Sequence, residues 1–317
     1  MRQGVAFGLR IAGDFPASGL WRAVPEGPAR RVALEIVERS ELACPWAEGD
    51  GQPPLRMAVG DPGPVLAIDA HPARGYLVRA DGFGAYQVAP DGRRVLFAPG
   101  HVEDWRWQRL LTAQVLPIAA LSQRLELLHA SAVALDGRIF AFTGAGGAGK
   151  STLAARLILA GASFISDDVL AVERVDDQVI AHPGPALMNL RESPVPVLNA
   201  RERSRLGVEI GRDEGGARLL VRRESSASPL HAVYLLRRNG SRTGGVRVRR
   251  LAPPAPGALL GAGFGTAIRT PARLVRLLDL CAHLARRVPV FALEAPSHVP
   301  SAVLGDEVRR HMERSAS

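Results

Sequence analysis

Short apolar runs separated by glycine-containing turns fill much of the first hundred residues. Asp81-Gly82 and Asp91-Gly92 fall between consecutive runs. An Asp-Gly pair between apolar segments is a strong hairpin signal. The segments expected to form strands are Pro64–Ala70, Gly75–Ala80, Gly84–Ala89 and Arg94–Ala98. The pattern predicts a β-rich N-terminal domain over residues 1–100, in which no catalytic constellation is evident.

The periodicity changes at about residue 101. Glu103 and Asp104 supply the negative charge that the first turn of a helix favours. The apolar residues that follow at roughly helical spacing are Leu110, Leu111, Val115, Ile118, Leu121, Leu125 and Leu128. Pro117 lies among them and is expected to kink or split the helix, because proline has no backbone N–H to donate. We therefore expect a helical connector over residues 101–128.

Strand and helix signals alternate in the remaining chain. The expected strands include His129–Leu135, Arg138–Thr143 and Ala162–Ser166, and the expected helices include Lys150–Ala160 and Arg273–Arg287. Alternation of this kind is typical of an α/β domain with a parallel sheet, here over residues 129–317. The stretch Pro183–Gly216 is rich in proline and arginine, and we expect it to be partly loop, with a lid or substrate loop as its candidate role.

Composition narrows the class of protein. The chain has 317 residues, of which 47% are apolar, as is typical of a globular fold with one large or two smaller domains. The longest largely apolar run, Leu110–Leu121, is about half the length of a membrane span, so we expect no transmembrane helix and no membrane partner. The two cysteines, Cys44 and Cys281, are too few for a disulfide framework, and a reducing cytoplasm is the expected location.

The chain is basic, with a formal net charge of +9. This balance could indicate a nucleic-acid partner, but the arginines are scattered and aromatic residues make up only 5%, which argues against a base-stacking surface. Of the 40 Lys and Arg residues, Lys150 is the only lysine. Because all the other basic residues are arginine, the lysine at position 150 suggests that this position needs a compact ammonium group.

That lysine lies in a segment that fits G-x-x-x-x-G-K-[ST], between an expected strand and an expected helix. Glycines allow the tight turn that points backbone N–H groups inward, and the following helix N-terminus adds positive potential. In such a loop the lysine reaches the β- and γ-phosphates and the serine hydroxyl binds Mg²⁺. The predicted nucleotide-binding residues are Gly144, Ala145, Gly146, Gly147, Ala148, Gly149, Lys150, Ser151 and Thr152.

An acidic pair, Asp167-Asp168, follows the next expected strand. If the sheet is parallel, this strand and the phosphate loop end at the same edge. One carboxylate could then hold Mg²⁺ and the other could accept the proton of an attacking hydroxyl. A solvated turn is the plainer alternative. His129 opens the strand pair before the loop, where it could tune the carboxylate or contact the phosphoryl group, although a lone histidine is more often a packing residue.

The stretches Leu128–Val133, Gly144–Thr152 and Ile165–Leu170 resemble the HPr serine kinase/phosphorylase family. They resemble still more the HPr-kinase-like proteins encoded beside bacterial peptide-biosynthesis genes, which include lasso-peptide tailoring kinases. The resemblance implies an α/β P-loop kinase domain of the HPr kinase/phosphoenolpyruvate carboxykinase type, preceded here by the smaller β-rich domain. It also implies ATP and Mg²⁺ as cofactors and transfer of the γ-phosphate to a serine of a peptide or protein.

Carried over by position, the resemblance makes Asp167 the base, Asp168 and Ser151 the metal side, and His129 and Lys150 catalytic residues. HPr kinases have a glycine-rich signature downstream of the acidic pair. The corresponding region here offers only Asn189 and Arg191 as evident polar candidates.

Two other functions share the same loop. One is a small-molecule kinase, and the other is a non-catalytic regulator in which bound ATP orders loops for a partner. A phosphate loop alone indicates a nucleotide and not a reaction, so the acceptor stays open, as does a homo-oligomeric state.

Overall fold

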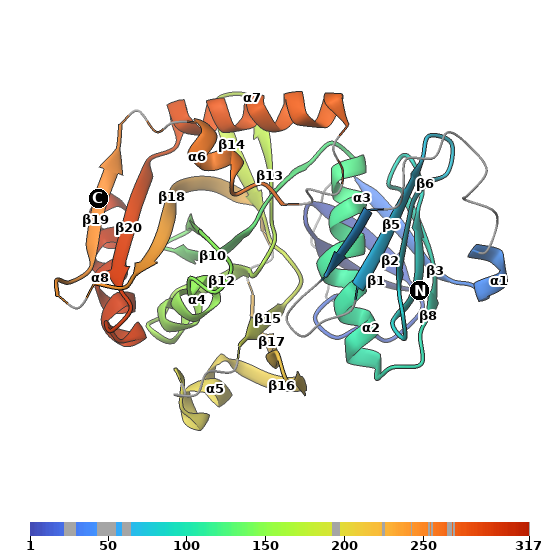
Figure 1. Cartoon of the computed structure of the whole chain (residues 1–317), viewed down its shortest axis with the longest axis horizontal. Helices are drawn as coiled ribbons and strands as arrows, with labels where there is room; N and C mark the ends of the chain where they lie inside the picture. The colour runs from blue at the N-terminus through green and yellow to red at the C-terminus, as the bar shows by residue number, and fades with distance from the viewer. Residues whose placement is uncertain are drawn as a thin grey trace.

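The computed structural model describes residues 1–21, 30–42, 55–58, 65–191, 197–223, 226–241, 243–252, 254, 256–264, 268 and 270–316, with the backbone alone for 55–58. Figure 1 shows two lobes, each built on its own β-sheet, and a third, small sheet below the second lobe. The chain is therefore a mixed α/β protein with several sheets. None of the helices in these described ranges is long and apolar enough to cross a membrane.

The N-terminal lobe contains an eight-stranded sheet in the order β1-β2-β3-β8-β7-β6-β5-β4. Its strands are β1 (Arg2–Ala6), β2 (Leu9–Gly13), β3 (Arg31–Ile36), β4 (Leu55–Ala58), β5 (Val65–His71), β6 (Gly75–Ala80), β7 (Gly84–Val88) and β8 (Arg94–Pro99). Strands β5 to β8 form an antiparallel meander, as the Asp-Gly turns predicted. A short helix, α1 (Arg39–Leu42), follows β3.

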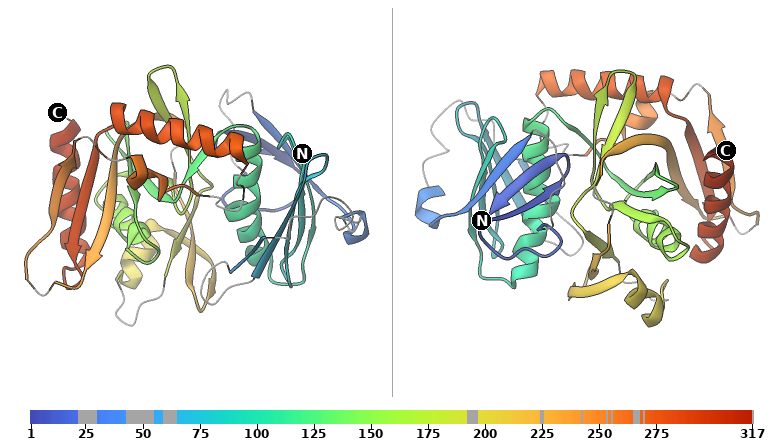
Figure 2. Two further views of the ribbon diagram at one scale, coloured as in Figure 1. Left: turned by 45° about the horizontal axis from the view of Figure 1, so that its top comes forward. Right: turned by 180° about the vertical axis from the view of Figure 1, so that it is seen from behind.

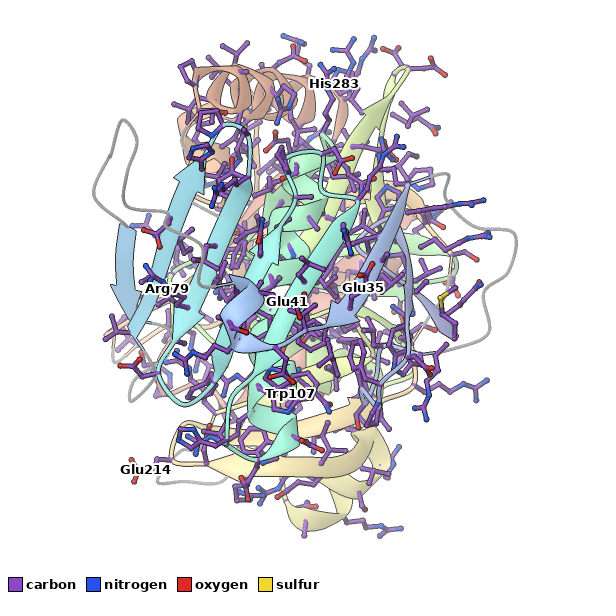
Figure 3. All side chains as sticks on the ribbon, turned by 90° about the vertical axis from the view of Figure 1, so that its right-hand side faces the viewer. Glu35, Glu41, Arg79, Trp107, Glu214 and His283 are labelled. Carbon is purple, nitrogen blue, oxygen red and sulfur yellow. The ribbon has the colours of Figure 1, made fainter. Side chains whose placement is uncertain are left out.

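One face of this sheet is covered by a helical segment made of α2 (Asp104–Leu110), the π-helical turn η1 (Leu111–Val115) and α3 (Leu116–Ser122). Trp107 of α2 packs into a cluster with Phe15 and Phe97. Figure 3 looks onto this sheet from outside, with Glu35 and Arg79 on its strands. The expected break at Pro117 is displaced: proline occupies the first turn of α3, where its missing N–H is harmless, and the irregular turn precedes it.

The second lobe contains a nine-stranded sheet, and it is mixed where a parallel sheet was expected. Its strands are β9 (Glu126–Leu128), β10 (Ala130–Leu135), β11 (Arg138–Thr143), β12 (Ser163–Ser166), β13 (Leu170–Val175), β14 (Gln178–His182), β18 (Ser228–Asn239), β19 (Arg247–Leu251) and β20 (Val290–Pro296). β11 pairs in parallel with β18, and β18 with β20. β10 lies between β11 and β12 and is antiparallel to both, so β11 and β12 run in the same direction.

Helices cover both faces of this sheet (Figures 1 and 2). α4 (Lys150–Leu159) and α8 (Ser301–Ala316) pack on one face, and α7 (Pro271–Arg287) with α6 (Pro256–Leu260) covers the other. The predicted helix at 273–287 is thus confirmed, and it begins two residues earlier at Pro271, after the N-cap Thr270.

The region 183–216, expected to be partly loop, is more regular than its composition suggested. It contains β15 (Leu187–Leu190), α5 (Ala200–Leu206) and β16 (Gly207–Asp213), and β17 (Gly216–Val221) completes a three-stranded sheet in the order β15-β17-β16. Asn199 and Glu202 form a reciprocal capping box at the start of α5. Residues 192–196 of the proposed lid lie outside the described residues.

Candidate active site

The glycine-rich loop joins the end of β11 to the start of α4. Gly147 and Gly149 have φ values of 78° and 96°, a conformation that favours glycine. Gly144 is restricted in another way, because a Cβ there would collide with the carbonyl oxygen of Leu236 on β18. At Gly147 and Gly149 a Cβ would meet no atom within 4 Å. The loop therefore packs closely against the sheet at its first glycine and leaves free space around Gly147 and Gly149, where the helix begins.

Lys150 lies inside this loop. Its side chain is buried, with the residue 6% exposed, and its Nζ donates hydrogen bonds to the carbonyl oxygens of Gly144 at 2.9 Å and Ala145 at 3.2 Å. Burial lowers the pKa of the ammonium, and the charges of Asp168 and Asp167 act in the opposite direction. The only lysine of the chain therefore sits as a compact cation between the loop and the acidic pair.

Strand register brings the predicted residues to one edge of the sheet. Ala130 of β10 is paired with Thr143 of β11, and Ala132 of β10 with Ser166 of β12. His129 precedes the start of β10, while the glycine-rich loop and the acidic pair follow the ends of β11 and β12. A parallel sheet was expected to bring these residues to one edge. In the structure they reach one edge because β11 and β12 run in the same direction, with the antiparallel strand β10 between them.

Asp167 is the most enclosed acid of this edge, with 8% of the residue exposed. The Ser131 hydroxyl donates to Oδ1 at 2.7 Å, and the backbone N–H of Asn189 donates to Oδ2 at 2.9 Å. Burial and, to a smaller extent, the neighbouring charge of Asp168 raise the pKa of Asp167 to about 6, against the lowering effect of the hydrogen bonds from Asn189, Ser131 and Ser151. The carboxyl group is thus held in place while remaining able to bind a proton near neutrality.

Asp168 is half-buried and has a φ of 66°, in the left-handed region. Its Oδ2 accepts a long hydrogen bond, 3.4 Å, from Asn189 Nδ2. Hard oxygen donors suit Mg²⁺, which keeps several waters and takes one or two carboxylates plus substrate phosphates. The Asp168 carboxylate and the Ser151 hydroxyl fit this donor set. Among the described residues, no group of three or more His, Cys, Asp or Glu side chains could hold a metal ion.

His129 lies half-buried at the same edge. Burial lowers its pKa, Lys150 and Arg191 act in the same direction, and Asp168 opposes them. These effects together favour the neutral form of the imidazole. Its backbone N–H donates to Ala262 O at 2.6 Å.

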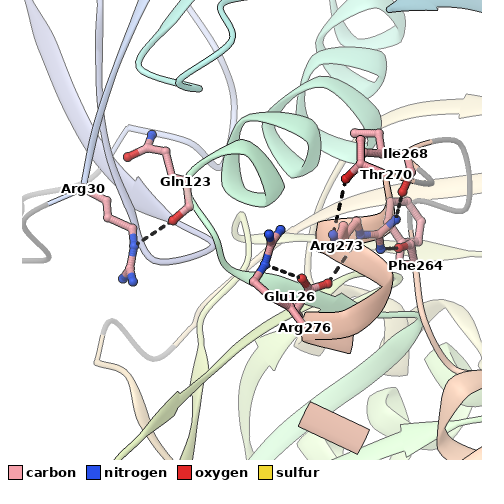
Figure 4. A network of polar contacts seen from close by, with 8 residues as sticks. All are labelled: Arg30, Gln123, Glu126, Phe264, Ile268, Thr270, Arg273 and Arg276. Atoms are coloured by element: carbon pink, nitrogen blue, oxygen red, sulfur yellow. Dashed lines mark hydrogen bonds and ion pairs between the residues drawn. The ribbon is translucent and has the colours of Figure 1, made fainter. Parts of the chain in front are cut away.

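Phe264 lies beside this histidine. The Phe264 ring lies 6.3 Å from the His129 ring, centroid to centroid. Arg273 of α7 donates to the carbonyl oxygens of Phe264 and Ile268, and Glu126 accepts from Arg273 at 3.4 Å (Figure 4). A buried ion pair thus fixes the position of the ring beside His129.

Four residues of the site's surroundings had no assigned role in the sequence. Ser131 lies two positions after His129 on the same strand, so strand alternation could have identified it. Asn189 stood out only as a polar residue in the region 183–196. Arg218 and Thr112 contact each other at 2.8 Å across 106 positions of sequence, and no local pattern indicates such a pair.

Comparison with known proteins adds little to this geometry. No family model and no curated protein matches the chain. Among solved structures, one match is the HPr(Ser) kinase/phosphatase from Coxiella burnetii, with 13% sequence identity and a TM-score of 0.30, over 61% of this chain and 99% of that one. A likeness this weak carries no argument, so the function is argued below from the site.

Proposed function

We propose that this protein is an ATP-dependent phosphotransferase that moves the γ-phosphate of ATP to a serine hydroxyl of a peptide or protein. The observation that carries the proposal is the convergence of the Lys150 loop and the Asp167-Asp168 pair at one sheet edge, with the pKa of Asp167 raised to about 6. A general base works best when its pKa lies near the working pH. Serine as the acceptor rests on the motif resemblance.

In the proposed reaction, the loop N–H groups and Lys150 hold the β- and γ-phosphates. Lys150 exchanges its hydrogen bonds to Gly144 O and Ala145 O for phosphate oxygens. Ser151 and Asp168 supply ligands for Mg²⁺, which when bound offsets the negative charge of the phosphates. His129, in its neutral form, can hydrogen-bond the transferred group without adding charge.

Asp167 accepts the proton of the acceptor hydroxyl as its oxygen bonds to the γ-phosphorus. The bond from that phosphorus to the bridging oxygen breaks, and ADP leaves with the electron pair. Ser131 and the Asn189 amide keep the carboxyl group oriented during this proton transfer. Removal of a general base of this kind lowers the rate by about 10²–10⁴-fold.

The test compares two single carboxylate variants with the parent. Each protein is incubated with ATP, Mg²⁺ and a degenerate serine-peptide library, and phosphopeptides are measured by mass spectrometry beside ATP affinity. Asp167→Asn should abolish most transfer while ATP still binds, and Asp168→Asn should raise the Mg²⁺ concentration needed for half-maximal rate. Unchanged transfer by Asp167→Asn contradicts the assignment of the base.

The two alternative functions give different outcomes. Phosphate incorporation into a metabolite extract, with none into peptides, indicates a small-molecule kinase. ATP binding without transfer or hydrolysis indicates a non-catalytic regulator. In either case the peptide-kinase proposal is wrong.

A further inference from the structure

The N-terminal lobe is hydrogen-bonded to the chain segment that leads to Asn189. The backbone N–H of Phe7, in the turn between β1 and β2, donates to Pro183 O at 2.7 Å. The N–H of Ala186 in turn donates to Gly19 O at 2.8 Å. β15 begins immediately after these contacts and carries Asn189, whose amide and side chain reach the acidic pair.

Helix α2 of the same lobe packs against β16 on the other side of the small sheet. The Trp105 ring covers the backbone of Gly211 so closely that a Cβ there would overlap it. Arg109 pairs with Asp213 at 3.3 Å. The small sheet that carries Asn189 is thus held by the N-terminal lobe from two directions.

Arg218 lies between these contacts, on the central strand β17. It is 4% exposed and directly opposite Asn189 in the β15–β17 register. One guanidinium nitrogen donates to Thr112 Oγ1 at 2.8 Å, and the other lies 3.5 Å from Asn189 Oδ1. Within the described residues, no carboxylate forms a salt bridge with this guanidinium. A buried cation without such a partner is costly, which indicates a role other than stability.

Thr112 belongs to the π-helical turn η1. Its hydroxyl donates to Gln108 O at 2.8 Å, so the proton is occupied and a lone pair faces Arg218. π-Helical turns of this kind occur frequently at functional sites. Here the Thr112 side chain, which comes from the N-terminal lobe, contacts Arg218 on the central strand of the small sheet.

We infer that the N-terminal lobe positions the acidic pair through Thr112 and Arg218, which act as positioning residues by orienting Asn189. The inference rests on the proposed function, because it gives this linkage a task in phosphoryl transfer. Asn189 is the common element, since its backbone N–H binds Asp167 and its side-chain amide binds Asp168. Burial lowers the pKa of the Arg218 guanidinium to about 9, and the nearby charge of Arg109 lowers it too, while the charges of Asp168 and Asp167 act in the opposite direction. The lobe is accordingly part of the catalytic unit.

The test uses four variants of the full-length chain. Thr112→Val removes the acceptor with little change of volume, Thr112→Ser keeps it, and Arg218→Met removes the donor. Arg109→Gln is the matched control, because it breaks an ion pair between the same helix and the same small sheet that does not reach Asn189. Each variant is assayed for serine-peptide phosphorylation, and amide hydrogen exchange is measured at Asn189.

Thr112→Val and Arg218→Met should lower kcat about 10–100-fold with an unchanged KM for MgATP, as second-layer changes do around other sites. These two variants should also speed hydrogen exchange of the Asn189 amide. Thr112→Ser and Arg109→Gln should keep the parental kcat and the parental exchange rate. The inference is overturned if Arg109→Gln matches Thr112→Val, or if Asn189 exchange is unchanged in Thr112→Val. If the parent protein transfers no phosphate, the proposed function fails, and the exchange data still decide whether the linkage holds Asn189.

Discussion

Ionisation of Asp167 should reduce the stability of the folded protein. The pKa of this carboxyl rises from 3.8 to about 6 on folding, mainly through burial. A folded-state pKa above the unfolded value means that the bound proton contributes stability below pH 3.8. That contribution is lost as pH rises through about 6. A rise of about two in the pKa corresponds to about 3 kcal/mol, which is the full loss of folding free energy when Asp167 is ionised at pH 8.

Asp167→Asn removes the ionisable group and leaves a similar shape. Its amide oxygen can accept from the Asn189 N–H, and its NH₂ group faces the Ser131 oxygen, so the exchange of hydrogen bonds costs about 1 kcal/mol at every pH. The pH-dependent part is separate from this constant. From pH 5 to pH 8 the variant should gain about 1–2 kcal/mol relative to the parent. In thermal unfolding this is a relative rise of about 2–4 °C in Tm for each kcal/mol.

The assay is thermal unfolding of parent and variant between pH 5 and pH 8 in a chelator, so that no divalent cation compensates the charge. Asp136→Asn is the control, since Asp136 lies exposed in the turn between β10 and β11. Added Mg²⁺ should reduce the pH trend of the parent, because a cation at the acidic pair favours the ionised form. If the two variants follow the same pH trend, Asp167 carries no raised pKa and the reasoning about its burial is wrong.

Three further results are expected. The kcat/KM of the parent should fall below about pH 6, because protonated Asp167 cannot accept a proton, and a flat profile down to pH 5 contradicts this. Gly144→Ala should destabilise the protein by about 1–3 kcal/mol through its collision with a β18 carbonyl. Gly146→Ala, where a Cβ meets nothing, should unfold like the parent in denaturant titrations. Lys150→Arg should retain the fold but lose about 10²–10³-fold in transfer rate, since a planar fork cannot replace the compact ammonium. Transfer at the parental rate would remove the explanation for the single lysine.

The glycine-rich loop and its flanking elements could be predicted because their determinants are local. Glycines supply the positive φ angles of the turn, and the strand Arg138–Thr143 appears within the predicted bounds. The helix from Lys150 ends one residue before its expected last residue. The position of Asp167 at a strand end could also be predicted from the sequence, since Asp167 follows a short apolar run.

The surroundings of the site could not be predicted, because they depend on long-range pairing. Asn189 reaches Asp167 only because β15 joins β17 in a separate small sheet, in a region whose prolines and arginines indicated a loop. Arg218 resembles any other arginine of a chain that uses arginine almost everywhere. Its burial and its contact with Thr112 follow from how two lobes pack, which no periodicity along the chain encodes.

Several unfavourable features of the described structure lie at this one edge. Asp167 is buried with its pKa raised, Asp168 adopts a left-handed backbone, and Lys150 is buried against its own loop. Glu173 provides the contrast: it lies at a lobe contact, and its partners His182 and Arg30 lower its pKa to about 2, so its charge is favoured by the fold. A charge that the fold stabilises is sufficiently explained by packing. Charges and backbone conformations that the fold tolerates at a cost are typical of functional sites, where consistency between sequence and structure is given up for chemistry. This contrast is the physical reason to seek the reaction at the edge formed by β10, β11 and β12.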